Sequence, residues 1–271
     1  MQPSDYAHDA ARAGPGEPEL RVTRSGRVHR LTLNRPHVGN ALNQGLAEAF
    51  RAEVTTIAAA DQPQIVVLKS TGSLFCAGGD LGEVLNAGDP EAYLTELAST
   101  MAAAVATMRQ WSHLLVAQVQ GAAAGAGLAL VLNSDLVIAA DTATFLSAYT
   151  RVGLTPDCGL SALLPAVVGP RRAAELTLTN RKLTAAEAHR WGMVNEVVAA
   201  DELGPRVDAV AEQLAAGASH AQAGTNALLK TADRRPYDDH LRAEVDNLAH
   251  QIRLDDTLER LHQFLYRSAS G

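Results

Sequence analysis

Apolar and polar residues alternate with a period of two near the beginning of the chain. Leu20 and Val22 are separated by a polar residue, a Ser-Gly pair follows, and Leu31 and Leu33 resume the alternation. Such alternation places every second side chain on one face of a strand, and Ser-Gly is typical of a tight turn. The pattern therefore predicts a β-hairpin over residues 19–33.

The spacing of apolar residues then changes to three and four. Between residues 42 and 57 the positions that follow this spacing are Leu42, Leu46, Phe50, Val54 and Ile57. This spacing predicts an amphipathic helix. Asn40 or Asn43 is the expected N-cap, because an asparagine side chain accepts hydrogen bonds from the first helical turn.

Short apolar runs and Gly-rich segments alternate through the middle of the chain. A Gly-rich loop over 71–90 precedes a predicted helix over 91–110, and a small-residue turn that begins at residue 121 leads into another helix. The apolar runs are too short for helices and predict buried strands, at 65–68, 114–119 and 136–140. Strands that alternate with helices are typical of stacked βαβ units, so we expect an α/β fold.

Helical spacing dominates from about residue 160 onward. One apolar stripe spans 203–214, and a second begins at Leu241 and is expected to continue in the same helix through Leu258 and Leu261. Both stripes need a covering surface, since the apolar face of a helix is normally buried. The expected organisation is a polar, Pro/Gly-rich leader over 1–17, a core over 18–200 and a helical region over 201–271.

Composition and charge disfavour several functional classes. The chain has 271 residues, of which 23 are basic and 30 acidic, and no basic run suited to nucleic acid is present. The leader lacks the apolar segment of a signal peptide, and no window reads as a membrane span. Cys76 and Cys158 lie far apart without metal-ligand spacing. We therefore expect no metal site, no nucleic-acid or membrane partner, and a cytoplasmic location.

Two Gly-rich stretches each follow a predicted buried strand, namely FCAGGDL at 75–81 and GAAAGAGL at 121–128. Each stretch alone fits a tight turn. The second fits a dinucleotide-binding fingerprint poorly, because Leu130 stands at the third glycine position. Taken together, the two loops offer uncovered backbone N–H groups, and such groups form an oxyanion hole when they converge on one point.

A lone carboxylate stands in the stretch GLTPDCGL at 153–160. Asp157 follows a proline, and aspartate in that context often serves only as a turn residue. The alternative role is a catalytic base. The chain lacks a GxSxG elbow, a Walker loop and an HExxH helix, so these residues carry the candidate chemistry.

Several motifs in order make the chain resemble the crotonase superfamily, the enoyl-CoA hydratase/isomerase family. The resemblance covers nearly the whole chain from about residue 19 and rests on LTLNRPHVGNALN, VVLKSTGSLFCAGGDL, VAQVQGAAAGAGLALVLNSDLVIAADTATF, GLTPDCGLSALLPAVVG and LTAAEAHRWGMVNEVV. It implies a crotonase-like ββα spiral core with a C-terminal helical trimerisation region. The expected assembly is a homotrimer or a hexamer.

The resemblance also assigns roles to individual residues. The backbone N–H groups of Gly79 and Ala126 would be the oxyanion donors that hold the carbonyl of a CoA thioester. The acyl-CoA itself would lie along residues of both Gly-rich loops and of the loop near residue 40, namely Val38, Ala41, Ala77, Asp80, Leu81, Ala122 and Tyr149. Gly39 stands where related chains often place a Lys or Arg for the CoA phosphates. Coenzyme A would enter as part of the substrate, with no separate cofactor.

The acidic positions of the resemblance point to the reaction. Ala129 and Tyr149 stand where hydratases of the family carry two glutamates, and water addition without either carboxylate is hard to sustain. Asp157 stands where isomerase branches keep a carboxylate, and the nearest likeness is to the branch that acts on ring-epoxide phenylacetyl-CoA and enoyl-CoA. The resemblance thus implies an acyl-CoA isomerase. An acyl-CoA decarboxylase with Tyr149 at its site, or a non-catalytic acyl-CoA-binding protein, are the alternatives.

Overall fold

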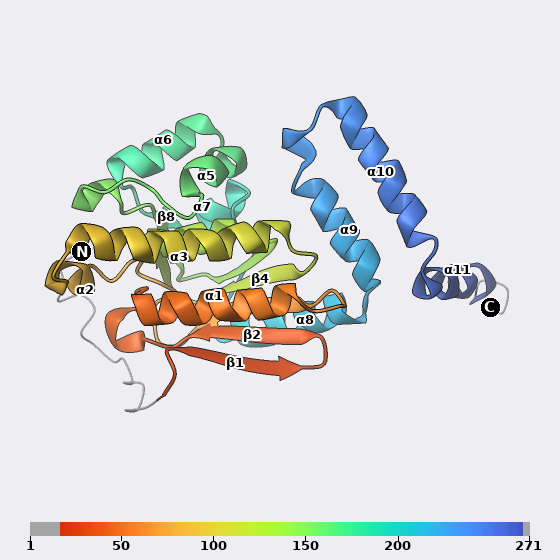
Figure 1. The fold of residues 1–271 in the computed structure, drawn as a ribbon, viewed down its shortest axis with the longest axis horizontal. Helices are drawn as coiled ribbons and strands as arrows, with labels where there is room; N and C mark the ends of the chain where they lie inside the picture. The colour runs from red at the N-terminus through yellow and green to blue at the C-terminus, as the bar shows by residue number, and fades with distance from the viewer. Residues whose placement is uncertain (1–16, 268–271) are drawn as a thin grey trace.

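The computed structural model describes residues 17–267 of the chain. A six-stranded sheet lies at the centre of the fold (Figure 1). The strands in spatial order are β1 (Leu20–Ser25), β2 (Val28–Leu33), β3 (Ile65–Ser70), β4 (Leu114–Val119), β6 (Leu136–Ala140) and β9 (Glu196–Val198). β1 and β2 pair antiparallel, whereas all later neighbours pair in parallel. The predicted hairpin and the three predicted strands are confirmed, while the predicted leader lies outside the described residues except for Glu17.

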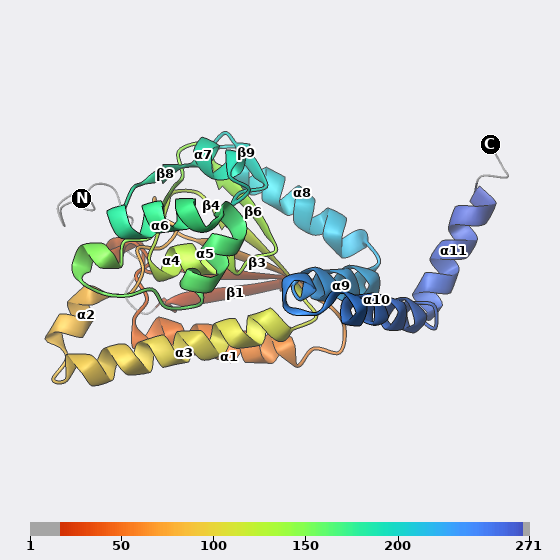
Figure 2. The same ribbon diagram turned by 90° about the horizontal axis from the view of Figure 1, so that it is seen from above.

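Helices cover both faces of this sheet (Figure 2). α1 (Gln44–Ala58) and α3 (Pro90–Gln110) lie on one face, and α8 (Leu203–Ala216) lies on the opposite face. β3 serves both layers, because Val66 and Leu68 pack in the core with α1 and α3 while Ile65 and Val67 pack in the core with α8. A strand buried on both faces explains why this run is continuously apolar.

Asn43 is the N-cap of α1. Its side chain accepts a hydrogen bond from the Leu46 backbone N–H at 2.9 Å. Asn40 has a left-handed backbone with φ 56° and instead donates to the carbonyls of Thr71 and Leu74. The two asparagines therefore have different tasks, since one begins the helix and the other joins the loop before it to the loop after β3.

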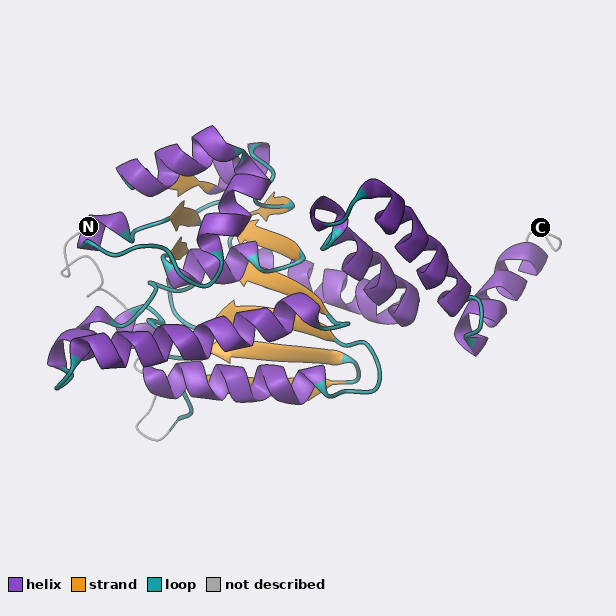
Figure 3. Ribbon diagram, turned by 45° about the horizontal axis from the view of Figure 1, so that its top comes forward, coloured by secondary structure: helices purple, strands orange, loops and turns teal. Residues whose placement is uncertain are grey.

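A second, three-stranded sheet lies beside the first and contains β5 (Ala122–Ala124), β7 (Thr144–Leu146) and β8 (Leu183–Thr184) (Figure 3). Helices accompany it, namely α4 (Ala126–Leu132), α5 (Leu160–Val168), α6 (Pro170–Thr179) and α7 (Ala185–Arg190). β5 was predicted as part of a turn. It forms a strand because β7 pairs with it in parallel, although three alanines have little strand preference of their own.

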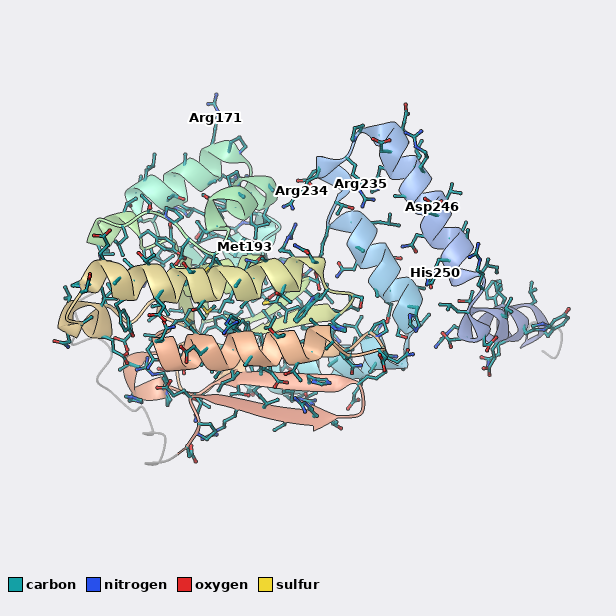
Figure 4. The ribbon with its side chains drawn as sticks, in the orientation of Figure 1. Arg171, Met193, Arg234, Arg235, Asp246 and His250 are labelled. Carbon is teal, nitrogen blue, oxygen red and sulfur yellow. The ribbon has the colours of Figure 1, made fainter. Side chains whose placement is uncertain are left out.

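The last three helices form an arm that extends away from the two sheets, which we call the C-terminal arm (Figure 1). It comprises α9 (Ser219–Leu229), α10 (Tyr237–Gln251) and α11 (Asp255–Arg267). Figure 4 labels Asp246 and His250 on α10, well apart from Met193 in the body of the molecule. The predicted single helix through Leu261 is wrong, because α10 ends at Gln251 and α11 begins at Asp255. Two aspartates in the first turn of α11 favour a new helix start, since carboxylates stabilise helix N-termini.

Apolar side chains of the C-terminal arm face solvent. Val245 is 65% exposed and Leu248 is 73% exposed. A space of about 820 Å³ lies between α9, α10 and α11. This surface supports the prediction of a trimer or hexamer, which stays a prediction. Within residues 17–267, no helix combines the length and the apolar character that a membrane crossing requires.

Candidate active site

Two loops meet at one edge of the large sheet because they leave neighbouring parallel strands. β3 ends at Ser70 and β4 ends at Val119, and the carboxyl ends of parallel strands lie at the same edge. Backbone hydrogen bonds then join the loops directly. The Ala124 N–H donates to the Cys76 carbonyl at 2.8 Å, and the Cys76 N–H donates to the Ala122 carbonyl at 3.2 Å.

Two of the glycines at the contact between these loops have a backbone with positive φ. Gly78 has φ 100°, and a Cβ atom added there would lie 3.1 Å from the Ala124 carbonyl oxygen and 3.6 Å from the Ala126 nitrogen. Gly125 has φ 55°, and a Cβ atom there would lie 3.6 Å from the Gly78 Cα. Both backbone angles are in the region that favours glycine. The two turns can therefore approach each other main chain to main chain.

Two backbone amides at this contact are left without an acceptor. Within residues 17–267, neither the Gly79 N–H nor the Ala126 N–H donates a hydrogen bond. Their neighbours in sequence do: the Asp80 N–H donates to Leu42 at 2.8 Å, and the Gly125 N–H donates to Leu146 at 3.1 Å. Ala126 opens α4, where the first N–H groups have no partner inside the helix. The loops thus present two unused donors, as an oxyanion hole requires.

A cavity of about 230 Å³ lies at these amides and is lined mostly by apolar residues. Six of the predicted site residues line it: Ala77, Gly79, Leu81, Ala126, Tyr149 and Asp157. Aliphatic side chains complete the wall, among them Leu94, Leu146, Val152 and Leu154. Arg151 also lines the cavity and is exposed. Among the lining residues that the structure describes, Asp157 carries the single carboxylate.

Four predicted contact residues do not line the cavity, and the structure gives each a different environment. Val38 ends the 3-10 turn η2 (Pro36–Val38), and the Ala41 carbonyl accepts a hydrogen bond from Arg35. The Asp80 side chain accepts a hydrogen bond from the backbone of α2 (Leu81–Asn86). The Ala122 carbonyl accepts hydrogen bonds from the other Gly-rich loop. These residues therefore support the loops, and their contact with acyl-CoA stays a prediction.

Tyr149 and Asp157 form a hydrogen-bonded pair that was not predicted from the sequence. The Tyr149 hydroxyl donates to Asp157 Oδ1 at 2.5 Å. Burial raises the pKa of Tyr149 far above its usual value, and the charge of the Asp157 carboxylate raises this pKa further. The phenol therefore keeps its proton at neutral pH and acts as a donor. The two residues lie on either side of the 3-10 turn η3 (Thr150–Val152), which brings them together.

Asn133 holds the turn that carries Asp157. Its side-chain amide donates to the Cys158 carbonyl at 3.1 Å and to the Ala129 carbonyl at 2.8 Å, so it fastens the turn to the end of α4. Cys158 has φ 50° and Gly159 has φ 82°, and the chain then enters α5. The sequence offered no signal for this role beyond an asparagine at a helix end, where such side chains commonly bond backbone groups.

Both cysteines are packing residues. Cys76 and Cys158 are buried, and burial raises the pKa of Cys76 to about 12. Burial, with the neighbouring Asp157 charge, also raises the pKa of Cys158 strongly. Only the thiolate is a good nucleophile, so neither thiol is suited to attack a substrate at neutral pH.

We expect iodoacetamide at pH 8 to leave both cysteines of the folded chain unmodified, because both thiols stay protonated and covered. The chain unfolded in urea should take up two labels, as measured by intact mass. The packing role would be contradicted if either cysteine were labelled at the same rate in the folded chain as in the unfolded chain.

A buried arginine ties together the segments behind the Gly79 loop. The guanidinium of Arg35 lies 2.9 Å from carboxylate oxygens of Glu19, Asp80 and Glu83, and it donates to the Ala41 carbonyl at 2.6 Å. Asp80 is also the N-cap of α2 (Leu81–Asn86). The prediction of loop throughout 71–90 is wrong at this point. The capping aspartate was the signal for a helix start that was overlooked.

The chain is similar in sequence to proteins of a known family. A family model described as "Enoyl-CoA hydratase/isomerase" matches residues 23–269. The chain belongs to the enoyl-CoA hydratase/isomerase family. It is 32% identical over 242 residues to the 1,2-epoxyphenylacetyl-CoA isomerase of Escherichia coli, and the match covers 88% of this chain and 92% of that protein. It is 31% identical over 252 residues to 4-chlorobenzoyl coenzyme A dehalogenase-2 of Arthrobacter, with 90% of each chain covered.

Solved members of the enoyl-CoA hydratase/isomerase family share the fold. A Thermobifida fusca protein assigned as an enoyl-CoA hydratase, with a crystal structure in complex with CoA, superimposes with a TM-score of 0.80 at 32% identity. That match covers 87% of this chain and 93% of the other. The predicted resemblance to the crotonase superfamily and the predicted α/β crotonase-like fold are thereby confirmed.

Ala129 and Tyr149, the positions at which the family resemblance predicts glutamates in hydratases, have different surroundings. Ala129 lies in α4 and is completely buried. Tyr149 lines the cavity with its hydroxyl on Asp157. Neither position supplies a carboxylate, so Asp157 alone provides an acidic side chain among the described lining residues.

Proposed function

We propose that this protein is an acyl-CoA isomerase that catalyses a double-bond shift or a ring-epoxide shift through an enolate stabilised by an oxyanion hole. The observation that carries the proposal is a cavity in which one carboxylate, Asp157, faces the same space as the two unused amides of Gly79 and Ala126. One base is sufficient for moving a proton between two carbons of one substrate, whereas addition of water commonly uses two acid or base groups.

In the proposed reaction the thioester oxygen accepts hydrogen bonds from the Gly79 and Ala126 N–H groups. These donors stabilise the negative charge that develops on the oxygen when a proton leaves the carbon next to the carbonyl. The Asp157 carboxylate takes that proton from C2 of a 3-enoyl-CoA and returns it to C4. The double bond thereby moves from C3–C4 to C2–C3, and protons and electrons balance without any cofactor.

The aliphatic wall of the cavity supports an apolar acyl group. Leu94, Leu146 and Leu154 present only carbon atoms to the space beside Asp157. Apolar walls also keep water away from the enolate, which protects it from wasteful side reactions. Coenzyme A is proposed as a part of the substrate, and the CoA complex of the Thermobifida fusca relative supports this choice.

A substrate panel tests the proposal and separates it from its alternatives. The purified chain is incubated with 3-hexenoyl-CoA, 1,2-epoxyphenylacetyl-CoA, 2-hexenoyl-CoA, methylmalonyl-CoA and 4-chlorobenzoyl-CoA, and the products are identified by mass and absorbance. A double-bond shift or epoxide opening supports the isomerase. Hydration of 2-hexenoyl-CoA would instead indicate a hydratase, and CO₂ release would indicate a decarboxylase. Chloride release would indicate a dehalogenase, and binding without turnover would indicate a non-catalytic binder.

Removal of one oxyanion donor should slow the reaction without unfolding the chain. Ala126→Pro removes the N–H at the first position of α4, where proline is well tolerated. We expect kcat to fall by about 10²- to 10³-fold, the usual effect of losing one such donor. Gly79→Pro removes the other N–H and should show a loss of similar size in the same assay.

Ser219→Pro is the matched control, because Ser219 occupies the first position of α9, outside the cavity. This variant should keep the kcat of the parent chain. An Ala126→Pro enzyme that is folded by circular dichroism and still turns over at the parent rate would contradict the oxyanion assignment.

A further inference from the structure

The hydroxyl of Tyr149 has a partner but no assigned task in the proposed reaction. It donates to Asp157 Oδ1 at 2.5 Å, and Tyr149 is buried, with 8% of its surface exposed. A phenol buried beside a carboxylate stays protonated, so it offers one donor and holds one carboxylate oxygen. Hydrogen bonds to an ionised acceptor are stronger than those between neutral groups and fix the geometry of the acceptor.

The backbone around Tyr149 is firmly held. The Tyr149 carbonyl accepts hydrogen bonds from the Val152 N–H at 3.1 Å and the Leu154 N–H at 3.0 Å, which closes the turn η3. The next side chain, Thr150, donates to the Thr177 carbonyl at 2.8 Å and accepts from Asn180 at 2.7 Å. These bonds fasten the turn to α6, so the position of the hydroxyl is set by the scaffold.

Tyr149 also lines the same cavity as the donor residues Gly79 and Ala126. A Cβ atom added at Gly125, which immediately precedes Ala126, would lie 3.9 Å from Tyr149 Cζ, so only the room of one missing side-chain atom separates the ring from this turn. The hydroxyl on the same ring carbon holds Asp157. One side chain therefore borders both the oxyanion donors and the base of the proposed reaction.

We propose that Tyr149 is a positioning residue for Asp157: its hydroxyl holds Oδ1, so that Oδ2 is the oxygen that exchanges the proton with the acyl chain. This inference rests on the proposed function. It assigns Tyr149 the task of fixing the distance between base and oxyanion hole. A displacement of about 1 Å at a reacting group typically lowers rate by about 10²-fold, which sets the scale of the effect.

The Tyr149→Phe variant tests this role, because it removes the hydroxyl and keeps the ring in the cavity wall. We expect kcat for 3-hexenoyl-CoA to fall by about 10- to 10²-fold while KM changes by less than about threefold, since the oxyanion donors and the apolar wall remain. A residue with a merely structural role would lower the unfolding midpoint and leave the kcat of the folded fraction unchanged.

Tyr93→Phe is the matched control. Tyr93 donates its hydroxyl to Glu83 Oε2 at 2.7 Å, and neither residue lines the cavity. The two substitutions remove the same kind of hydrogen bond, so they should lower the midpoint of urea unfolding by similar amounts. Only Tyr149→Phe should lower kcat. A Tyr149→Leu variant, which also removes the ring, should lose more kcat than Tyr149→Phe.

The outcomes separate this inference from the function on which it rests. A wild-type chain that is inactive on every thioester of the panel would overturn the proposed function and the positioning role with it. A wild-type chain that isomerises 3-hexenoyl-CoA, together with a Tyr149→Phe variant of equal kcat, would overturn the positioning role alone. A larger kcat loss in Tyr93→Phe than in Tyr149→Phe would do the same, because the loss would then not arise at Asp157.

Discussion

Asp157→Asn is expected to lower kcat for 3-hexenoyl-CoA by about 10²- to 10⁴-fold, the contribution typical of a positioned general base. The amide has nearly the same shape as the carboxylate and retains an oxygen that accepts from the Tyr149 hydroxyl, but it does not take up a proton from carbon. The apolar wall and the two backbone donors remain in place. Affinity for hexanoyl-CoA, which has no double bond to shift, should therefore stay close to that of the parent in calorimetric titrations.

Asp141→Asn provides the control for this substitution. Asp141 is exposed, follows β6 and does not line the cavity. The kcat of the Asp141→Asn variant should therefore equal that of the parent chain. Retained isomerisation by a folded Asp157→Asn enzyme would remove Asp157 from the mechanism. The turn interpretation of the GLTPDCGL stretch would then be sufficient.

Arg35→Met is expected to have the largest effect on stability. The Arg35 side chain is 7% exposed and lies among three carboxylates, of which that of Asp80 is also well covered. Removal of one partner from a buried ion pair costs about 3 to 5 kcal/mol of unfolding free energy, because the remaining charge is left without compensation. At about 2 to 4 °C per kcal/mol for a chain of this size, the midpoint of thermal unfolding should fall by about 6 to 20 °C.

Arg24→Met is the matched control for this stability effect. Arg24 pairs with Glu53 at 2.7 Å, but its side chain is 51% exposed. Exposed ion pairs contribute about 0 to 1 kcal/mol, since water screens the charges and solvates the separated partners equally well. Differential scanning calorimetry of the two variants should show a clear difference. Equal midpoints would mean that the charges around Arg35 are solvated far more than their burial indicates.

Local pattern was sufficient to predict most of the framework. The strands over 114–119 and 136–140 have the predicted bounds, because each is a short apolar run buried by its neighbours. The apolar spacing predicted α1, and Asn43, one of the two asparagines expected near its start, is the N-cap. Failures came where a partner decides the structure. The alanines of β5 become a strand only beside β7, and the break at residues 252–254 divides a stripe that is continuous in sequence.

The candidate site was predictable in part. The Gly-rich loops and Asp157 stand out because glycine clusters and a lone acid in an apolar context are visible in the sequence. The Tyr149–Asp157 bond and the Arg35 cluster were not predictable, since polar contacts between loops follow no periodicity. Arg35 meets Asp80 and Glu83 from more than forty positions away along the chain. Only the assembled sheet brings such partners within reach.

The contact between the two Gly-rich turns can form only late in the synthesis of the chain on the ribosome. Gly79 follows β3 and Ala126 follows β4, and these strands become neighbours only after the intervening helix has crossed back over the sheet. Parallel pairing of this kind closes long loops and forms slowly. A nascent chain that stops before β4 therefore lacks Ala126, Tyr149 and Asp157, so the cavity that Gly79 lines forms only after more than half of the 271 residues have been synthesised.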